Sequence, residues 1–190
     1  MPPAAGSGTA LPVLCFLHGY GEAAPLAIDT ALRLHGPLNI QSAPAARLDF
    51  LVVAPQLPLA GDVWHRYADD VRAVLDEVSA RHAIDARRRY LTGFSFGGNG
   101  VFDLALMQPD LWAALWPVDP TRVPYKAVKQ PVWLSLGEIS RRQKAAFLRS
   151  LALAKRGERV WADDGEDHVG SARLAYADEG VYRWLLQFVR

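Results

Sequence analysis

Residues 93–97 constrain this chain more than any other feature, because two glycines flank a serine there in the order Gly-Phe-Ser-Phe-Gly. The largely apolar residues 89–94 predict a strand that leads into this motif, and residues 99–107 predict a helix that follows it. Two glycines at this spacing let a strand and a helix approach closely, and they leave the serine hydroxyl exposed on the turn between them. We therefore predict a strand–turn–helix unit with Ser95 at the carboxyl end of a strand.

Apolar runs and helical periodicities alternate along the rest of the chain. Strands are predicted over residues 13–17, 50–54, 89–94, 113–118, 132–136 and 159–162. Helices are predicted over residues 67–82, 99–107, 142–155 and 172–189. Parallel strands need crossover connections and bury both sides, so this alternation predicts an α/β fold with a doubly wound, mostly parallel sheet.

Length and composition fit an ordinary folded domain and give no sign of a polyanionic partner. The chain has 190 residues. We expect a flexible N-terminal segment over residues 1–10 and a single domain over residues 11–190. The formal net charge is +1, which argues against a nucleic-acid partner. No apolar run approaches the ~20 residues that span a bilayer, and no secretory signal is visible, so we expect a cytoplasmic protein. The sequence indicates no oligomeric state.

His168 is the candidate base for Ser95. It lies in a polar, acidic loop after the last predicted strand, which agrees with the chain order serine, acid, histidine known from proteins with this serine motif. His35 and His82 are expected to be exposed, and His65 lies in a loop. No histidine pair has the spacing of zinc ligands, so neither a metal nor an organic cofactor is expected.

A second glycine-rich loop follows the first predicted strand, with the sequence His-Gly-Tyr-Gly at residues 18–21. Such a loop can turn one backbone amide toward the serine, and the residue after the serine supplies another. We predict that the N–H groups of Tyr20 and Phe96 form an oxyanion hole and that His18 fixes the loop.

Three aromatic residues, Trp64, Trp116 and Tyr125, are candidates for lining a substrate pocket beside Ser95. The competing interpretation is that they belong to the core, where aromatic side chains are more often found.

Together these motifs resemble the carboxylesterase, phospholipase and depolymerase-like branch of the α/β-hydrolases, including its predicted peptidases. The resemblance runs from Pro12 onward and includes the segments at residues 17–22, 84–88, 90–98, 109–114 and 182–186. It implies an α/β-hydrolase fold and a serine esterase that cleaves a small soluble ester, or a related thioester or amide, through an acyl-enzyme. About a dozen residues separate Val118 from Pro131, so no substantial lid is expected. The alternatives are a non-catalytic binding protein on the same scaffold and an acyltransferase.

The acid of the expected triad is where the chain departs from the family. Family members usually carry Gly-x-x-Asp after the strand over residues 132–136, and Ser140 stands here at the aspartate position. Glu138 in the same loop is the first choice for the acid, and Asp119 after the preceding strand is the alternative. Asp163, Asp164, Asp167 or no acid at all remain open. The missing aspartate is the main argument for the non-catalytic alternative.

Overall fold

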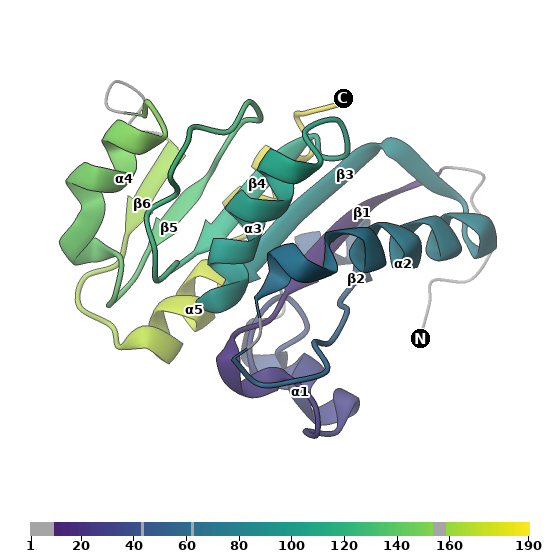
Figure 1. Ribbon diagram of the computed structural model, residues 1–190, viewed down its shortest axis with the longest axis horizontal. Coiled ribbons are helices and arrows are strands. Elements are labelled where there is room, and N and C mark those ends of the chain that lie inside the picture. Colours follow the sequence, from purple (N-terminus) through teal and green to yellow (C-terminus); the bar gives the residue numbers. More distant parts are fainter. Residues whose placement is uncertain (1–9, 43, 62, 154–158) are drawn as a thin grey trace.

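A six-stranded sheet, parallel throughout, forms the centre of the computed structural model, which describes residues 10–42, 44–61, 63–153 and 159–190. The strands are β1 (Leu11–Leu17), β2 (Leu51–Val53), β3 (Ile84–Phe94), β4 (Ala114–Val118), β5 (Leu134–Leu136) and β6 (Val160–Ala162). Their order across the sheet is β2-β1-β3-β4-β5-β6 (Figure 1). The expected flexible segment lies outside the described residues except for Ala10.

Helices cover both faces of this sheet. They are α1 (Ile28–Leu34), α2 (Ala68–Arg81), α3 (Phe96–Met107), α4 (Lys144–Ser150), α5 (His168–Ala177) and α6 (Glu179–Leu185). Short 3-10 turns span Tyr20–Glu22, Ile40–Ser42, Ala45–Asp49, Trp64–Tyr67 and Arg141–Gln143. Figure 1 shows α2 and α3 in front of the sheet.

The two sides of the sheet carry separate apolar cores. Along β1, Cys15 and Leu17 pack in the core formed with α2, α3 and α4, while Leu14 and Phe16 pack in the core formed with α5 and α6. This alternation follows from the period of two in a strand, and burial on both sides explains why the strands are almost entirely apolar. The predicted doubly wound α/β fold is confirmed.

The C-terminal helical region differs from its prediction. One helix was expected over residues 172–189, but α5 begins at His168 and ends before Asp178, where α6 starts. The Asp167 side chain accepts the N–H of Gly170 at 2.6 Å, and the Asp178 side chain accepts the N–H of Gly180 at 2.8 Å. Both aspartates are N-caps, which start a new helix even within an apolar periodicity.

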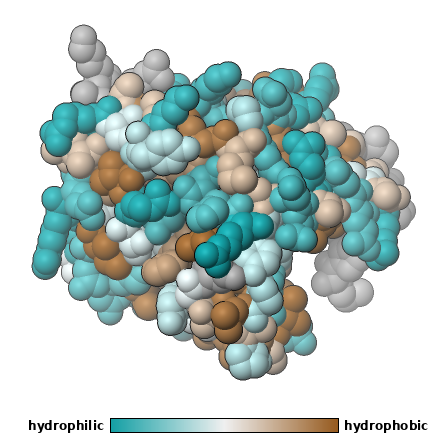
Figure 2. Space-filling model, in the orientation of Figure 1, coloured by the Kyte–Doolittle hydropathy of each residue, from teal (hydrophilic) through white to brown (hydrophobic). Residues whose placement is uncertain are grey.

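The face that carries α2 and α3 is mainly hydrophilic, with apolar side chains in small separate groups (Figure 2). Among the described residues, no helix combines the length and the apolar character needed to cross a membrane.

Gly97→Ala is expected to lower the free energy of unfolding by about 2 kcal/mol or more, because a Cβ there would overlap the Leu17 carbonyl oxygen and push α3 off the sheet. Urea unfolding followed by circular dichroism measures this change. Gly21→Ala is the matched control, since a Cβ at Gly21 has no atom within 4 Å to meet. Equal stability of the two variants would contradict the proposed contact.

Candidate active site

Ser95 stands at the tight turn between β3 and α3, as its motif predicts. Its backbone has φ 58° and ψ −116°, a conformation that residues with a side chain rarely adopt and that costs of order 1–3 kcal/mol. The Ser95 N–H donates to the Val118 carbonyl at 3.0 Å, so the hydrogen bonding of the sheet extends to the strained residue. Ser95 is 7% exposed, less than the motif alone suggests, because the loop at Gly19 lies against it.

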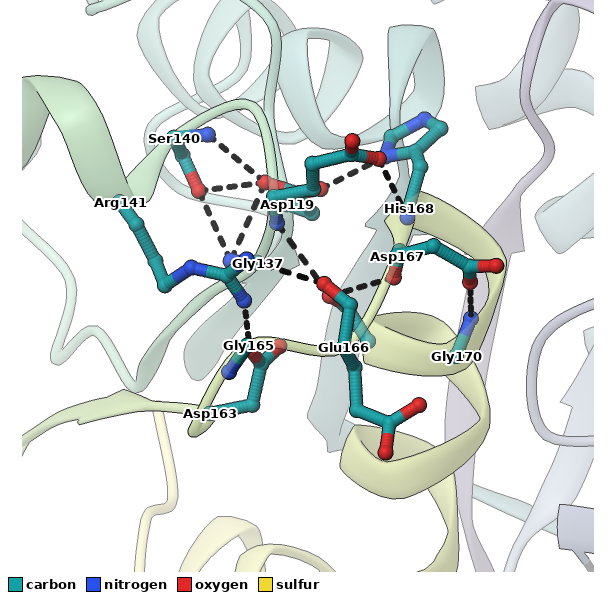
Figure 3. A network of polar contacts seen from close by, with 12 residues as sticks. Asp119, Gly137, Ser140, Arg141, Asp163, Gly165, Glu166, Asp167, His168 and Gly170 are labelled. Carbon is teal, nitrogen blue, oxygen red and sulfur yellow. Dashed lines mark hydrogen bonds and ion pairs between the residues drawn. The ribbon is translucent and has the colours of Figure 1, made fainter.

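His168 lies beside this turn, at the first position of α5. Its ring stacks at a tilt on the Phe94 ring with the centroids 4.4 Å apart. Its Nδ1 lies 2.6 Å from Oδ2 of Asp119, and the other ring nitrogen points away from the carboxyl group (Figure 3). A carboxylate only accepts hydrogen bonds, so the tautomer of the imidazole that fits this contact has its proton on Nδ1 and its lone pair on Nε2.

Asp119 is fully buried at the end of β4 and has a positive φ of 37°. Its Oδ1 accepts the Ser140 hydroxyl at 2.6 Å and the Ser140 N–H at 2.9 Å, and Oδ2 accepts the Ile139 N–H at 3.3 Å. Burial alone would raise the pKa of Asp119. The hydrogen bonds from His168, Ser140 and Ile139 outweigh burial and hold that pKa below its ordinary value, so the carboxylate is ionised at neutral pH.

Glu138, the first choice for the acid, contacts a different part of His168. Its Oε2 accepts the His168 backbone N–H at 2.7 Å, and the residue is exposed. A carboxylate at this position stabilises the first turn of α5, whose N–H groups have no partner inside the helix. The structure therefore brings Asp119 to the imidazole ring and Glu138 to the main chain.

The three remaining carboxylates also lie away from the imidazole nitrogens. Asp163 forms an ion pair with Arg141, Asp167 caps α5 through Gly170, and Asp164 is exposed (Figure 3). Arg141 further donates to the Glu166 carbonyl at 2.9 Å. These contacts hold the 163–167 loop in place and thereby position the start of α5.

The loop after β1 is held by two buried polar side chains. His18 accepts the Leu57 N–H through Nε2 at 2.9 Å and donates through Nδ1 to the Gly19 carbonyl at 2.6 Å. Burial lowers the pKa of His18, so its ring stays neutral and keeps the acceptor that Leu57 needs. Glu22, which the sequence reasoning left without a role, is 2% exposed and accepts the Gly19 N–H at 2.7 Å.

This arrangement holds the loop after β1 against the serine turn. A Cβ on Gly19 would lie 3.4 Å from the Ser95 Cβ, and the Tyr20 ring meets the Phe96 ring edge to face at 5.5 Å. The Phe96 N–H opens α3 and is one of the four amides without a partner inside the helix. The Gly19 N–H is occupied by Glu22, so the next amide along the loop is that of Tyr20.

A cavity of about 600 Å³ adjoins the serine turn on the side of α3, and we call it the Phe96 pocket. Trp64 and Tyr125 line it together with Phe96. Farther along α3, Asp103 lines the pocket and pairs with Arg122 at 2.8 and 2.9 Å. The pocket is therefore aromatic near Ser95 and charged farther away.

Trp116 does not join the other two predicted aromatic residues. It is fully buried on the face of the sheet opposite α3, where it packs on Tyr176 and Tyr182 and donates to the Ser135 hydroxyl at 3.1 Å. Its place in the strand sends its side chain to that face, since successive residues of a strand point to opposite sides. Trp116 is a core residue.

Within the described residues, no group of three or more His, Cys, Asp or Glu side chains is arranged to hold a metal ion.

Comparisons with known proteins support the fold. The sequence profile of the prolyl oligopeptidase family matches residues 60–131, which include Ser95 and the residues that line the Phe96 pocket. A thermostable esterase of known structure has 22% identity and a TM-score of 0.76, with 100% of this chain aligned to 58% of that chain. The chain thus spans less than two thirds of that esterase. A search of curated proteins found no match.

Two further solved structures have the same fold. A fluorophosphonate-binding serine hydrolase from Staphylococcus aureus has 16% identity and a TM-score of 0.65, covering 96% of this chain and 86% of its own. The feruloyl esterase module from Clostridium thermocellum, solved as a serine-to-alanine mutant with sinapinate, has 14% identity and a TM-score of 0.64, covering 95% and 78%.

Glu22→Gln should remove a pH-dependent cost to folding. Burial raises the pKa of the Glu22 carboxyl from 4.5 to about 7, although the Gly19 hydrogen bond opposes the shift. A carboxyl whose folded-state pKa is raised contributes stability at low pH that is lost as the pH rises toward that pKa. Between about pH 5 and about pH 8, the free energy of unfolding of Glu22→Gln should rise relative to wild type by about 2 kcal/mol.

Urea unfolding at several pH values tests this expectation, and Glu77→Gln on the exposed face of α2 is the matched control. A difference between wild type and Glu22→Gln that stays constant with pH would mean that the carboxyl ionises normally.

Proposed function

The chain has the α/β-hydrolase fold, and we propose that it is a serine hydrolase that cleaves a carboxylic ester, or a related thioester or amide, through an acyl-enzyme. One observation carries this proposal: Ser95 is held in a strained turn directly after Phe94, and the Phe94 ring stacks on the ring of His168, whose Nδ1 is bound by the buried Asp119 carboxylate at 2.6 Å. That combination activates a hydroxyl, because the carboxylate fixes the tautomer and stabilises the imidazolium that forms.

The reaction begins with proton transfer from the Ser95 hydroxyl to Nε2 of His168 as the oxygen attacks the carbonyl carbon. The carbonyl oxygen becomes an oxyanion, which accepts hydrogen bonds from the N–H groups of Tyr20 and Phe96. His168 then gives its proton to the leaving oxygen, and the bond to that oxygen breaks to leave the acyl group on Ser95. In the second half of the reaction His168 takes a proton from water as the water oxygen attacks the acyl-enzyme. His168 then returns that proton to the Ser95 oxygen, and the acid is released.

We propose Asp119 as the acid of this triad. Its Oδ2 contacts the imidazole Nδ1 directly, and the hydrogen bonds around it keep it ionised. Ser140 supports it through a hydroxyl donor at 2.6 Å. Ser140, which stands at the family's aspartate position, therefore donates a hydrogen bond to a carboxylate that follows the neighbouring strand β4. With Asp119 as the acid, a serine at position 140 is no argument for a non-catalytic protein.

The substrate class follows from the pocket and from the relatives. Two of the similar structures are esterases, and one is described as a fluorophosphonate-binding serine hydrolase. The aromatic lining of the Phe96 pocket suits an apolar or aromatic acyl group, and its volume lies within the range of small-molecule sites.

Ser95→Ala is expected to abolish hydrolysis of p-nitrophenyl esters, with turnover lower by about 10⁶, because no other hydroxyl replaces the nucleophile. Labelling by a fluorophosphonate probe should map to Ser95 in the wild type and disappear in the variant. Circular dichroism of the variant checks that the fold is retained. Labelling of a peptide that contains another serine would move the active site elsewhere.

Asp119→Asn should lower turnover by about 10⁴, since the amide removes the charge that stabilises the imidazolium and allows the wrong tautomer. Glu138→Gln is the matched control in the adjoining loop, and it should stay within about threefold of wild type because an amide oxygen still accepts the His168 N–H. Steady-state kinetics of both variants measure the ranking. The reverse ranking would assign the acid to Glu138.

A complementary substitution tests the role of Ser140. Placing a second carboxylate against Asp119 creates like charges in a buried site, which raises the pKa of one of them. Ser140→Asp should therefore reduce turnover, and an increase of about tenfold would indicate that Asp119 does not serve as the acid.

A further inference from the structure

A second cavity, of about 330 Å³, lies on the His168 side of the serine turn. Its walls come from the end of α1, the Ile40–Ser42 turn and α5, and the turn packs beside α5. We call it the Arg33 pocket. The residues that matter here are Arg33, Leu34, His35, Ile40, Val169 and Arg173.

This pocket is connected to the imidazole of His168 through a row of rings. The centroid of the Phe94 ring lies 4.4 Å from that of the His168 ring and 5.2 Å from that of the His35 ring. Val169, which directly follows His168, forms part of the wall. The Phe96 pocket is lined by the residue that follows Ser95, whereas the Arg33 pocket is lined by the residue that follows His168.

The direction of proton transfer decides which part of a substrate enters each pocket. His168 protonates the leaving oxygen, so that oxygen must lie near Nε2 and the group attached to it must extend along the His168 side. The acyl group then extends toward the Phe96 pocket. The Arg33 pocket has the chain neighbour of His168 in its wall, which makes it the candidate space for the leaving group.

The charge of the Arg33 pocket is positive. Arg33 has no ion pair among the residues that the structure describes, while Arg173 lies 3.6 Å from Glu166. The two guanidinium groups that line the cavity are permanently charged and match a carboxylate in geometry, and no Asp or Glu is among the described residues that line it. Leu34, Ile40 and Val169 supply exposed apolar surface between them.

We propose that the Arg33 pocket binds the leaving group of the substrate, and that this alcohol or thiol carries an anionic group on a short apolar body. The inference rests on the proposed hydrolase function and adds to it a preference on the leaving side. A benzoate-sized group fits the cavity volume.

The test compares two acetyl esters with the same acyl group, 3-acetoxybenzoate and 3-acetoxybenzamide, which differ in the charge of the leaving phenol. Wild type should favour the anionic ester by about tenfold in kcat/KM. The difference should lie mainly in KM, because the contact between the phenol's carboxylate and the arginines is made in the bound substrate as well as in the transition state. The preference should shrink between about 50 and about 500 mM sodium chloride. An anionic acyl group, as in p-nitrophenyl hemisuccinate compared with p-nitrophenyl butyrate, should give no such preference.

Arg33→Gln should lower the preference for the anionic phenol about threefold, and the double variant with Arg173→Gln should abolish it. Arg81→Gln is the control, since it removes the same charge from an exposed position on α2 and should leave both esters as in wild type. Circular dichroism confirms folding of each variant.

The outcomes separate this inference from the proposed function. Hydrolysis of both esters at equal kcat/KM, with labelling of Ser95, would overturn the leaving-group preference and keep the hydrolase. A preference that Arg33→Gln leaves unchanged, or an equal preference for the anionic acyl group, would also overturn it. Failure to hydrolyse either ester, with no labelling of Ser95, would overturn both.

Discussion

The close contact between the first turn of α3 and the end of β1 is the constraint on which the site depends. A side chain on Gly97 would overlap the Leu17 carbonyl, so the helix can lie over the strand only because that position is glycine. The chain must then turn within Ser95, which explains its φ of 58°. Leu17 pairs with Gly93 in the sheet, so the loop after β1 leaves beside the serine turn and brings its amides to it.

The sheet also holds the second strained residue. Asp119 has a φ of 37°, and its N–H donates to the Ser135 carbonyl at 2.8 Å, just as the Ser95 N–H donates to Val118. Each strained residue costs of order 1–3 kcal/mol, which the surrounding hydrogen bonds must offset. Parallel strands end at one edge, so residues after β3 and β4 converge there without help from a helix. This geometry lets Asp119 reach His168 from the end of β4, although the acid was expected in the loop after β5.

Local patterns in the sequence were enough to predict the alternating elements and the strained turn at Ser95, because both depend on neighbours in the chain. The acid could not be chosen in this way. Glu138 and Asp119 differ in which part of His168 they contact, and that depends on where the loop after β6 starts α5. The face taken by Trp116 likewise depends on the arrangement of helices across the sheet. Contacts between distant segments decided each of these features.

Glu22, in the loop after β1, is unfavourable as a buried carboxyl but holds the backbone of that loop in place. Its Oε1 is buried without a hydrogen-bond partner among the described residues, and burial raises the pKa of the carboxyl to about 7. A buried carboxyl of this kind is unfavourable, yet without it the Gly19 N–H would be a buried donor with no acceptor. Because Glu22 occupies the Gly19 amide, that amide is not free to bind an oxyanion, which supports the proposal that the Tyr20 amide is the donor from this loop. A local cost to folding thus satisfies the Gly19 amide beside the serine turn.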